Sequence, residues 1–93
     1  MEIPFEIKIG GLRVTVIEAP LMASERGHAG EFSFMRQEIR IDPSLPEGKK
    51  KETLVHEIVE AINAYCELDL PHDKITVMAF ALHQVLTDNK IRF

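Results

Sequence analysis

The hydrophobic pattern of this chain changes its period once, near Gly48. Before that point apolar residues alternate with polar or small ones, from Ile3 to Val16 and again from Phe32 to Ile41, as in half-buried β-strands. After it they recur about every 3.6 residues, as on one side of a helix. A chain of 93 residues is too short to bury two separate cores. We therefore predict one α+β domain over residues 1–93, with a β-sheet part at 1–42 and a helical part at 47–89.

The first part is predicted to be a small, mostly antiparallel β-sheet. Gly10 and Gly11 interrupt the first alternating segment, residues 3–18, and because glycine readily takes positive φ, this segment is interpreted as a β-hairpin. Residues 19–30 are expected to form a connecting loop. The second alternating segment is either another hairpin or one bent strand, and the turn residues that begin at Asp42 end it.

The second part is predicted to be two packed α-helices, at about residues 50–67 and 72–87, separated by Leu70 and Pro71. The second helix has apolar residues around most of its circumference, so we expect it to be the more buried of the two. Tyr65, Cys66 and Met78 are interpreted as core residues.

Composition excludes several classes of function. The longest apolar run, at residues 77–82, is far shorter than the roughly 20 residues that cross a bilayer, and the N-terminus lacks the pattern of a signal peptide. We therefore expect a cytoplasmic protein without membrane contact. The single cysteine excludes an internal disulfide. The net charge of −4 and the lack of a basic stripe argue against a nucleic-acid partner.

The segment HEIVE, at residues 56–60, differs from the H-E-x-x-H pattern of zinc peptidases in its last residue. On a helix His56 and Glu60 project from nearly the same strip, and Glu57 is turned by about 100° from His56. Zinc accepts carboxylate oxygen as well as imidazole nitrogen, at about 2.0 to 2.2 Å. The spacing therefore permits a metal site in which His56 and Glu60 bind one ion and Glu57 faces a bound water.

His72 is the candidate for a third metal ligand, because the corner before it can fold the second helix back against the first. His83 lies eleven residues further on, roughly 16 Å along the same helix, which is too far to share an ion with His72. His28 falls in the connecting loop, where it is either a substrate-side group or a solvated residue. An amphipathic surface helix would place His56 and Glu60 on its polar side without any ion, and this alternative stays open.

Four segments follow one another from Gln37 onward: QEIRID, HEIVEAIN, LPHDK and HQVLTDN. In these segments the chain from Glu38 to Asn89 resembles small zincin-like metallopeptidase domains of the phage and prophage type, with HExxE in place of HExxH. The resemblance covers slightly more than half of the chain and is most specific in HEIVEAIN. It implies a minimal zincin-like fold.

The resemblance also implies roles for individual residues. His56, Glu60 and His72 would bind Zn²⁺, and Glu57 would be the general base. The strand from Gln37 to Ile41 would be the sheet edge beside the cleft, where a peptide or protein pairs by strand addition.

Two functions follow as hypotheses. The first is a zinc-dependent metallopeptidase-like protein that hydrolyses peptide bonds through a metal-activated water, from which Glu57 takes a proton. Because Glu60 adds a negative charge where a neutral histidine is usual, we expect slow or restricted hydrolysis. The alternative is a non-catalytic zincin-like interaction or structural protein of phage or prophage origin. Two imidazoles and one carboxylate also suit other divalent ions, such as manganese or nickel.

Overall fold

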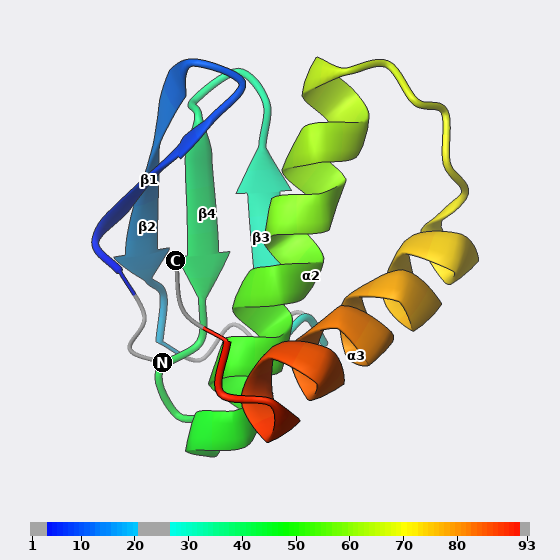
Figure 1. Cartoon of the computed structure of the whole chain (residues 1–93). Coiled ribbons are helices and arrows are strands. Elements are labelled where there is room, and N and C mark those ends of the chain that lie inside the picture. The colour runs from blue at the N-terminus through cyan, green and yellow to red at the C-terminus, as the bar shows by residue number, and fades with distance from the viewer. Residues whose placement is uncertain (1–3, 21–26, 92–93) are drawn as a thin grey trace.

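Four strands precede two helices in the computed structural model, which describes residues 4–20 and 27–91 (Figure 1). The elements are β1 (Glu6–Ile9), β2 (Leu12–Glu18), β3 (Gly30–Ser33), β4 (Glu38–Ile41), α2 (Glu47–Tyr65) and α3 (His72–Asp88). This order confirms the predicted fold class, a small, mostly antiparallel sheet followed by two packed helices.

The sheet has the strand order β1-β2-β4-β3. β1 and β2 form the predicted hairpin, and Gly10 and Gly11 take φ values of 59° and 83°, which is the conformation that a two-residue type I′ turn requires. The second alternating segment is also a hairpin: β3 pairs antiparallel with β4 across a turn at residues 34–37. β4 pairs parallel with β2, so the sheet is mixed.

The strand predicted to be the sheet edge is an interior strand, so that prediction was wrong. β4, which covers the predicted Gln37 to Ile41 strand from Glu38 onward, pairs with β2 on one side and β3 on the other. Gln37 lies just before the strand with a φ of 53°. The physical reason is that β3 folds back along β4 and occupies the side expected to be open. The edge strands are β1 and β3.

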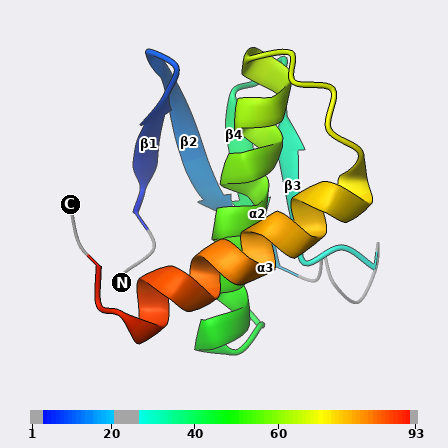
Figure 2. The same ribbon diagram turned by 45° about the vertical axis from the view of Figure 1, so that its right-hand side comes forward.

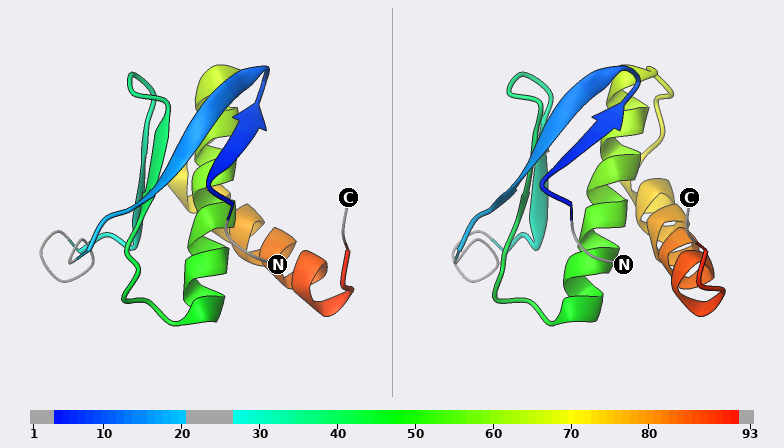
Figure 3. Two further views of the ribbon diagram at one scale, coloured as in Figure 1. Left: turned by 90° about the vertical axis from the view of Figure 1, so that its left-hand side faces the viewer. Right: turned by 60° about the vertical axis from the view of Figure 1, so that its left-hand side comes forward.

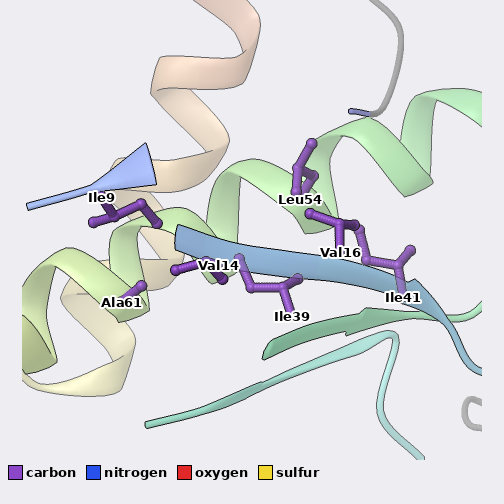
Figure 4. Close-up of a cluster of buried hydrophobic side chains, with 7 residues drawn as sticks. All are labelled: Ile9, Val14, Val16, Ile39, Ile41, Leu54 and Ala61. Carbon is purple, nitrogen blue, oxygen red and sulfur yellow. The ribbon is translucent and has the colours of Figure 1, made fainter. Parts of the chain in front are cut away.

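α2 lies between the sheet and α3, so the molecule has three layers (Figure 3). One face of α2 packs on the sheet and encloses the main core (Figure 4). The buried residues of that core are Ile9, Val14, Val16, Ile39, Ile41, Leu54 and Ala61. Phe32 on β3 and Tyr65 at the end of α2 extend it, with their rings edge to face and their centroids 5.5 Å apart. The alternating residues of the strands therefore supply one wall of the core and the helical period supplies the other.

α3 crosses the face of α2 that points away from the sheet (Figure 2). Ile75 and Ala79 are its buried residues, and they pack against Val55 and Val59 of α2. The expectation that α3 is the more buried helix was wrong, because only one narrow stripe of it meets α2. Met78, expected in the core, is 47% exposed.

Two smaller predictions about the helices can also be assessed. Cys66, expected in the core, is exposed. It is the C-cap residue after α2 and falls on the α3 side of that helix, where Ile62, one turn earlier, is also exposed. Tyr65, by contrast, packs against the main core as expected. Within the described residues, neither helix combines the length and the apolar content that a bilayer span requires.

Candidate functional site

α2 has a third face, between the one that packs on the sheet and the one that packs on α3. At about 100° per residue, the buried residues Leu54 and Val55 point to the sheet and to α3 respectively, and His56 continues the same rotation. His56 and Glu60 therefore lie on the α3 side of this third face, and Glu57 lies on its sheet side, next to β3. The helical period alone creates this arrangement once α2 is buried on two sides.

His56, Glu60 and His72 converge at the point where α3 begins. His56 Nε2 lies 3.5 Å from Glu60 Oε2, and His72 Nδ1 lies 3.0 Å from the same oxygen. The two imidazole rings stand edge to face, with centroids 5.1 Å apart. One ligand atom from each of the three side chains lies within 4.8 Å of the other two. The predicted convergence of these three side chains is thus observed.

Two of the three distances between the donor atoms are close to those of a tetrahedral metal site. Bonds of about 2.0 to 2.2 Å from one ion to nitrogen and oxygen ligands place those ligands about 3.3 Å apart, close to the two distances measured to Glu60. Three protein ligands leave a fourth position open. In the absence of an ion, the 3.0 Å contact between His72 and Glu60 is a hydrogen bond. The donor set does not determine which divalent ion the group would prefer, because several divalent ions accept two imidazoles and one carboxylate.

A cleft of about 520 Å³ opens over the three side chains. β3 contributes Gly30 and Phe32 to its lining, and Thr76 on α3 extends the lining beyond His72. His28, in the segment before β3, also lines the cleft. Its role was left open by the sequence. The edge strand and the three converging side chains thus share one cavity.

Glu57 is a nearly buried carboxylic acid in this cleft, with 7% of its surface exposed. Burial is the main cause that raises the pKa of its carboxyl group from 4.5 to about 7, and the negative charges of Glu60 and Glu31 contribute to the same shift. A carboxyl group with such a pKa can both accept and release a proton near neutral pH. A cation at the three converging side chains would oppose this shift.

β3 approaches α2 closely beside Glu57. A Cβ atom added to Gly30 would lie 2.6 Å from Thr53 Cγ2 and 3.2 Å from Glu57 Cγ. Thr53 is 3% exposed, lines the cleft, and its hydroxyl oxygen has no hydrogen-bond partner among the described residues. The glycine is therefore what allows the edge strand to lie against the carboxyl group, and Thr53 offers a free polar atom beside it.

Asn63, the last residue of HEIVEAIN, holds the corner between α2 and α3. Its side-chain oxygen accepts a hydrogen bond from the Leu70 N–H at 2.8 Å, and its side-chain nitrogen donates to the Leu70 carbonyl at 3.3 Å. Leu70 precedes Pro71, the N-cap of α3, so this pair of bonds sets where His72 begins the helix. We regard Asn63 as a positioning residue that the ligand spacing did not reveal, although its place in the motif was a signal.

His83 does not join the group. It lies on α3 outside the residues that line the cleft, and its Nε2 is buried without a hydrogen-bond partner in the described part of the chain. Its separation from His72 along one helix agrees with the distance expected from the sequence.

The fold and the converging side chains define a class: a small α+β protein with a group of two histidines and one glutamate that could hold a metal ion. Comparison with known proteins adds no narrower assignment, since no protein-family model, no curated protein and no solved structure matched the chain.

Proposed function

We propose that this chain is a small zincin-like metallopeptidase in which His56, Glu60 and His72 hold a divalent cation, with zinc as the leading candidate. The observation that carries the proposal is the convergence of these three side chains from α2 and α3 at a cleft that also contains Glu57. When bound, zinc would polarise a substrate carbonyl and lower the pKa of a coordinated water. The Glu60 carboxylate would moderate both effects by its negative charge.

Glu57 is the proposed general base. It follows His56 directly on α2 but points toward β3, so it does not compete for the ion with the three proposed ligands. Its buried position raises its pKa to about 7 in the metal-free protein, and a bound cation would oppose that shift and favour the ionised base. The carboxylate would accept a proton from the attacking water and deliver it to the leaving amine.

A peptide substrate would lie along β3 rather than along β4, because β3 has an edge beside the cleft that pairs with no other strand among the described residues. The Asp42 N–H donates to the Ala29 carbonyl across the β3–β4 pairing, at 3.1 Å. Since alternate residues of an antiparallel strand turn their N–H and C=O groups to opposite sides, those of Gly30 and Phe32 point to the free edge. These groups would pair with an extended peptide by strand addition and carry it past Glu57.

Cleavage of a broad peptide library, measured together with metal content, tests this proposal. Glu57→Gln should lower hydrolysis by about 10²-fold to 10⁴-fold and leave the metal content unchanged. Glu60→Gln should lose metal first and activity as a consequence, because an amide is a poorer ligand than a carboxylate. Glu52→Gln is the matched control, since Glu52 lines the same cleft one helical turn from His56 and should change neither quantity.

Two outcomes would redirect the interpretation. Loss of metal in Glu57→Gln with retention in Glu60→Gln would reverse the two assignments. A wild-type protein that contains stoichiometric metal but cleaves no peptide would refute catalysis and favour a zincin-like module that only binds its partner.

A further inference from the structure

The outward face of α3 carries apolar side chains that the rest of the described chain does not cover. α3 packs on α2 through Ile75 and Ala79, and Figure 2 shows its opposite side turned away from the molecule. Val77 is 69% exposed and Val85 is 41% exposed. A helix of this kind, apolar on its open side as well as its buried side, is typical of an element with a further partner.

Four of the exposed apolar residues of α3 form one stripe. At about 100° per residue, Val77, Met78, Ala81 and Val85 all fall within a sector of about 100°, and each of them is exposed. We call these four residues the α3 stripe. Phe80 and Leu82 are also exposed and lie outside this sector. The sector is centred on the side of the helix opposite to His72, so the α3 stripe lies away from the cleft.

A charged residue of opposite sign stands at each end of the α3 stripe. Lys74 precedes it and Asp88 follows it, and both are exposed and lie within the same sector. Each is seven residues from Ala81, or about 10 Å along the helix axis. Ala81 is thus the midpoint of the stripe and also its smallest side chain. If a second α3 stripe is reversed about Ala81 and laid on the first, each charged end therefore meets a charge of opposite sign.

We propose that the α3 stripe binds a second copy of this chain, with the two α3 helices antiparallel and related by a two-fold axis that passes between the two Ala81 residues. This arrangement places Lys74 opposite the partner's Asp88, and by symmetry places Asp88 opposite the partner's Lys74. Val77 then meets the partner's Val85. The small side chain of Ala81 lets the helix axes approach closely at the crossing point.

The charges decide for a second copy over another partner. An isologous contact requires that one surface complement itself, and the α3 stripe does so because Lys74 and Asp88 lie at equal distances on either side of Ala81. The proposal does not depend on the proposed peptidase function, because the cleft stays open in such a dimer. A single helix pair is a small interface, so we expect a weak, concentration-dependent dimer.

Exchange of the two charges tests the register of the helix pair. Lys74→Glu would face the partner's Asp88, and Asp88→Lys would face the partner's Lys74, so each single variant should shift sedimentation from twice the 10.6 kDa of one chain toward the monomer. The double variant restores both pairs with their signs exchanged and should dimerise again. The single variants are not expected to weaken the fold, since an acid near the start of a helix and a base near its end are favourable.

A cysteine at the symmetry axis tests the geometry independently. In a Cys66→Ser background, Ala81→Cys should form an intermolecular disulfide under mild oxidation, because a residue on the axis meets itself and a disulfide requires Cα atoms about 4.4 to 6.8 Å apart. Thr87→Cys, exposed on another side of α3, is the control and should not cross-link.

Three results would overturn the proposal. They are a wild-type chain that sediments as a monomer up to about 1 mM, a dimer unaffected by the single charge reversals, and a double variant that fails to recover association. Recovery by the double variant together with the cross-link at position 81 would establish the antiparallel pair.

Discussion

Glu57 shows how one position on a helix can take its chemical properties from the surrounding fold. Its neighbours in sequence are a partly buried histidine and an apolar residue, and its side chain lies against the edge strand and near Glu60. Burial is the main cause of its raised pKa, and the two nearby carboxylates add to it.

The stability of the metal-free protein should therefore fall as pH rises through this range. The folded-state pKa of Glu57 is about 7 and its reference value is 4.5, so between these values the folded chain binds more protons than the unfolded chain. The contribution is fully present below about pH 4.5 and is lost as pH rises through 7. At about 1.4 kcal/mol per pKa unit, the loss is at most about 3 to 4 kcal/mol.

Denaturant unfolding of chelator-treated protein between pH 4 and pH 8 measures this effect. Glu57→Gln removes the titrating group, so it should be more stable than the wild type at pH 8 and lose less stability between the two limits. Glu52→Gln should keep the wild-type slope. Equal pH slopes for the wild type and Glu57→Gln would show that burial of this carboxyl group does not matter to stability.

At the scale of elements, two local contacts set the width and the depth of the cleft. The approach of β3 to α2 depends on Gly30, and the start of α3 depends on the corner held by Asn63. Neither residue is a candidate ligand or base. Both determine whether the candidate residues meet.

Gly30→Ala should push the edge strand away from α2. Its new Cβ would also lie 3.1 Å from the Arg40 carbonyl oxygen, which belongs to the sheet and has little freedom to move, so we expect a loss of about 1 to 3 kcal/mol in unfolding free energy. Gly48→Ala is the control, because a Cβ there meets nothing within 4 Å and a helix gains up to about 1 kcal/mol from the change. Equal stability changes in the two variants would contradict the close contact.

Asn63→Ala should weaken metal binding without removing a ligand. The change leaves both backbone groups of Leu70 without their partner and frees the corner that places His72. Supporting residues of this kind typically alter metal affinity by about 10-fold to 100-fold, measurable by competition with a chromogenic chelator. Asn89→Ala removes a side-chain bond at the far end of α3, to the Val85 carbonyl, and should leave affinity unchanged. Unaltered affinity in Asn63→Ala would mean that helix packing alone positions His72.

At the scale of the whole molecule, the three layers are held together unequally. α2 has an extensive core against the sheet, whereas α3 is joined to α2 by a few buried side chains and by the His72 contact with Glu60. A cation bound between the helices would add a link where packing is thinnest. Its removal should affect α3 more than the sheet.

Treatment of the zinc-loaded protein with a chelator should lower Tm and increase amide exchange mainly in α3. An ion at 100 times its Kd stabilises the folded state by about 2.7 kcal/mol, and 1 kcal/mol shifts the Tm of a domain of this size by about 4 to 8 °C. We therefore expect a fall of about 10 °C or more. His28→Ala should retain this response and His72→Ala should abolish it. An unchanged Tm in protein shown to contain metal would mean that the ion lies elsewhere.

The local sequence pattern determined those structural features of this protein that depend on residues close together in the chain. The change of period at Gly48 predicted strands followed by helices, the Gly10-Gly11 pair predicted the first hairpin turn, and the spacing of His56 and Glu60 placed both on one strip of a helix. The approach of His72 was also predicted, because a short corner leaves a second helix few directions. These features follow from the two-residue and 3.6-residue periods of the hydrophobic pattern, which can be read directly from the sequence.

Tertiary structure alone decided which surfaces meet. β3 and β4 have similar alternation, so only their pairing determines that β4 is interior and β3 is the edge. The raised pKa of Glu57 requires the approach of Gly30, and the corner needs the distant bonds of Asn63 to Leu70. α3 was expected to be buried because its residues are apolar on most sides. The apolar residues of α3 show how much free energy its burial could contribute. They do not show which surface covers the helix, because that surface comes from residues remote in sequence or from another chain.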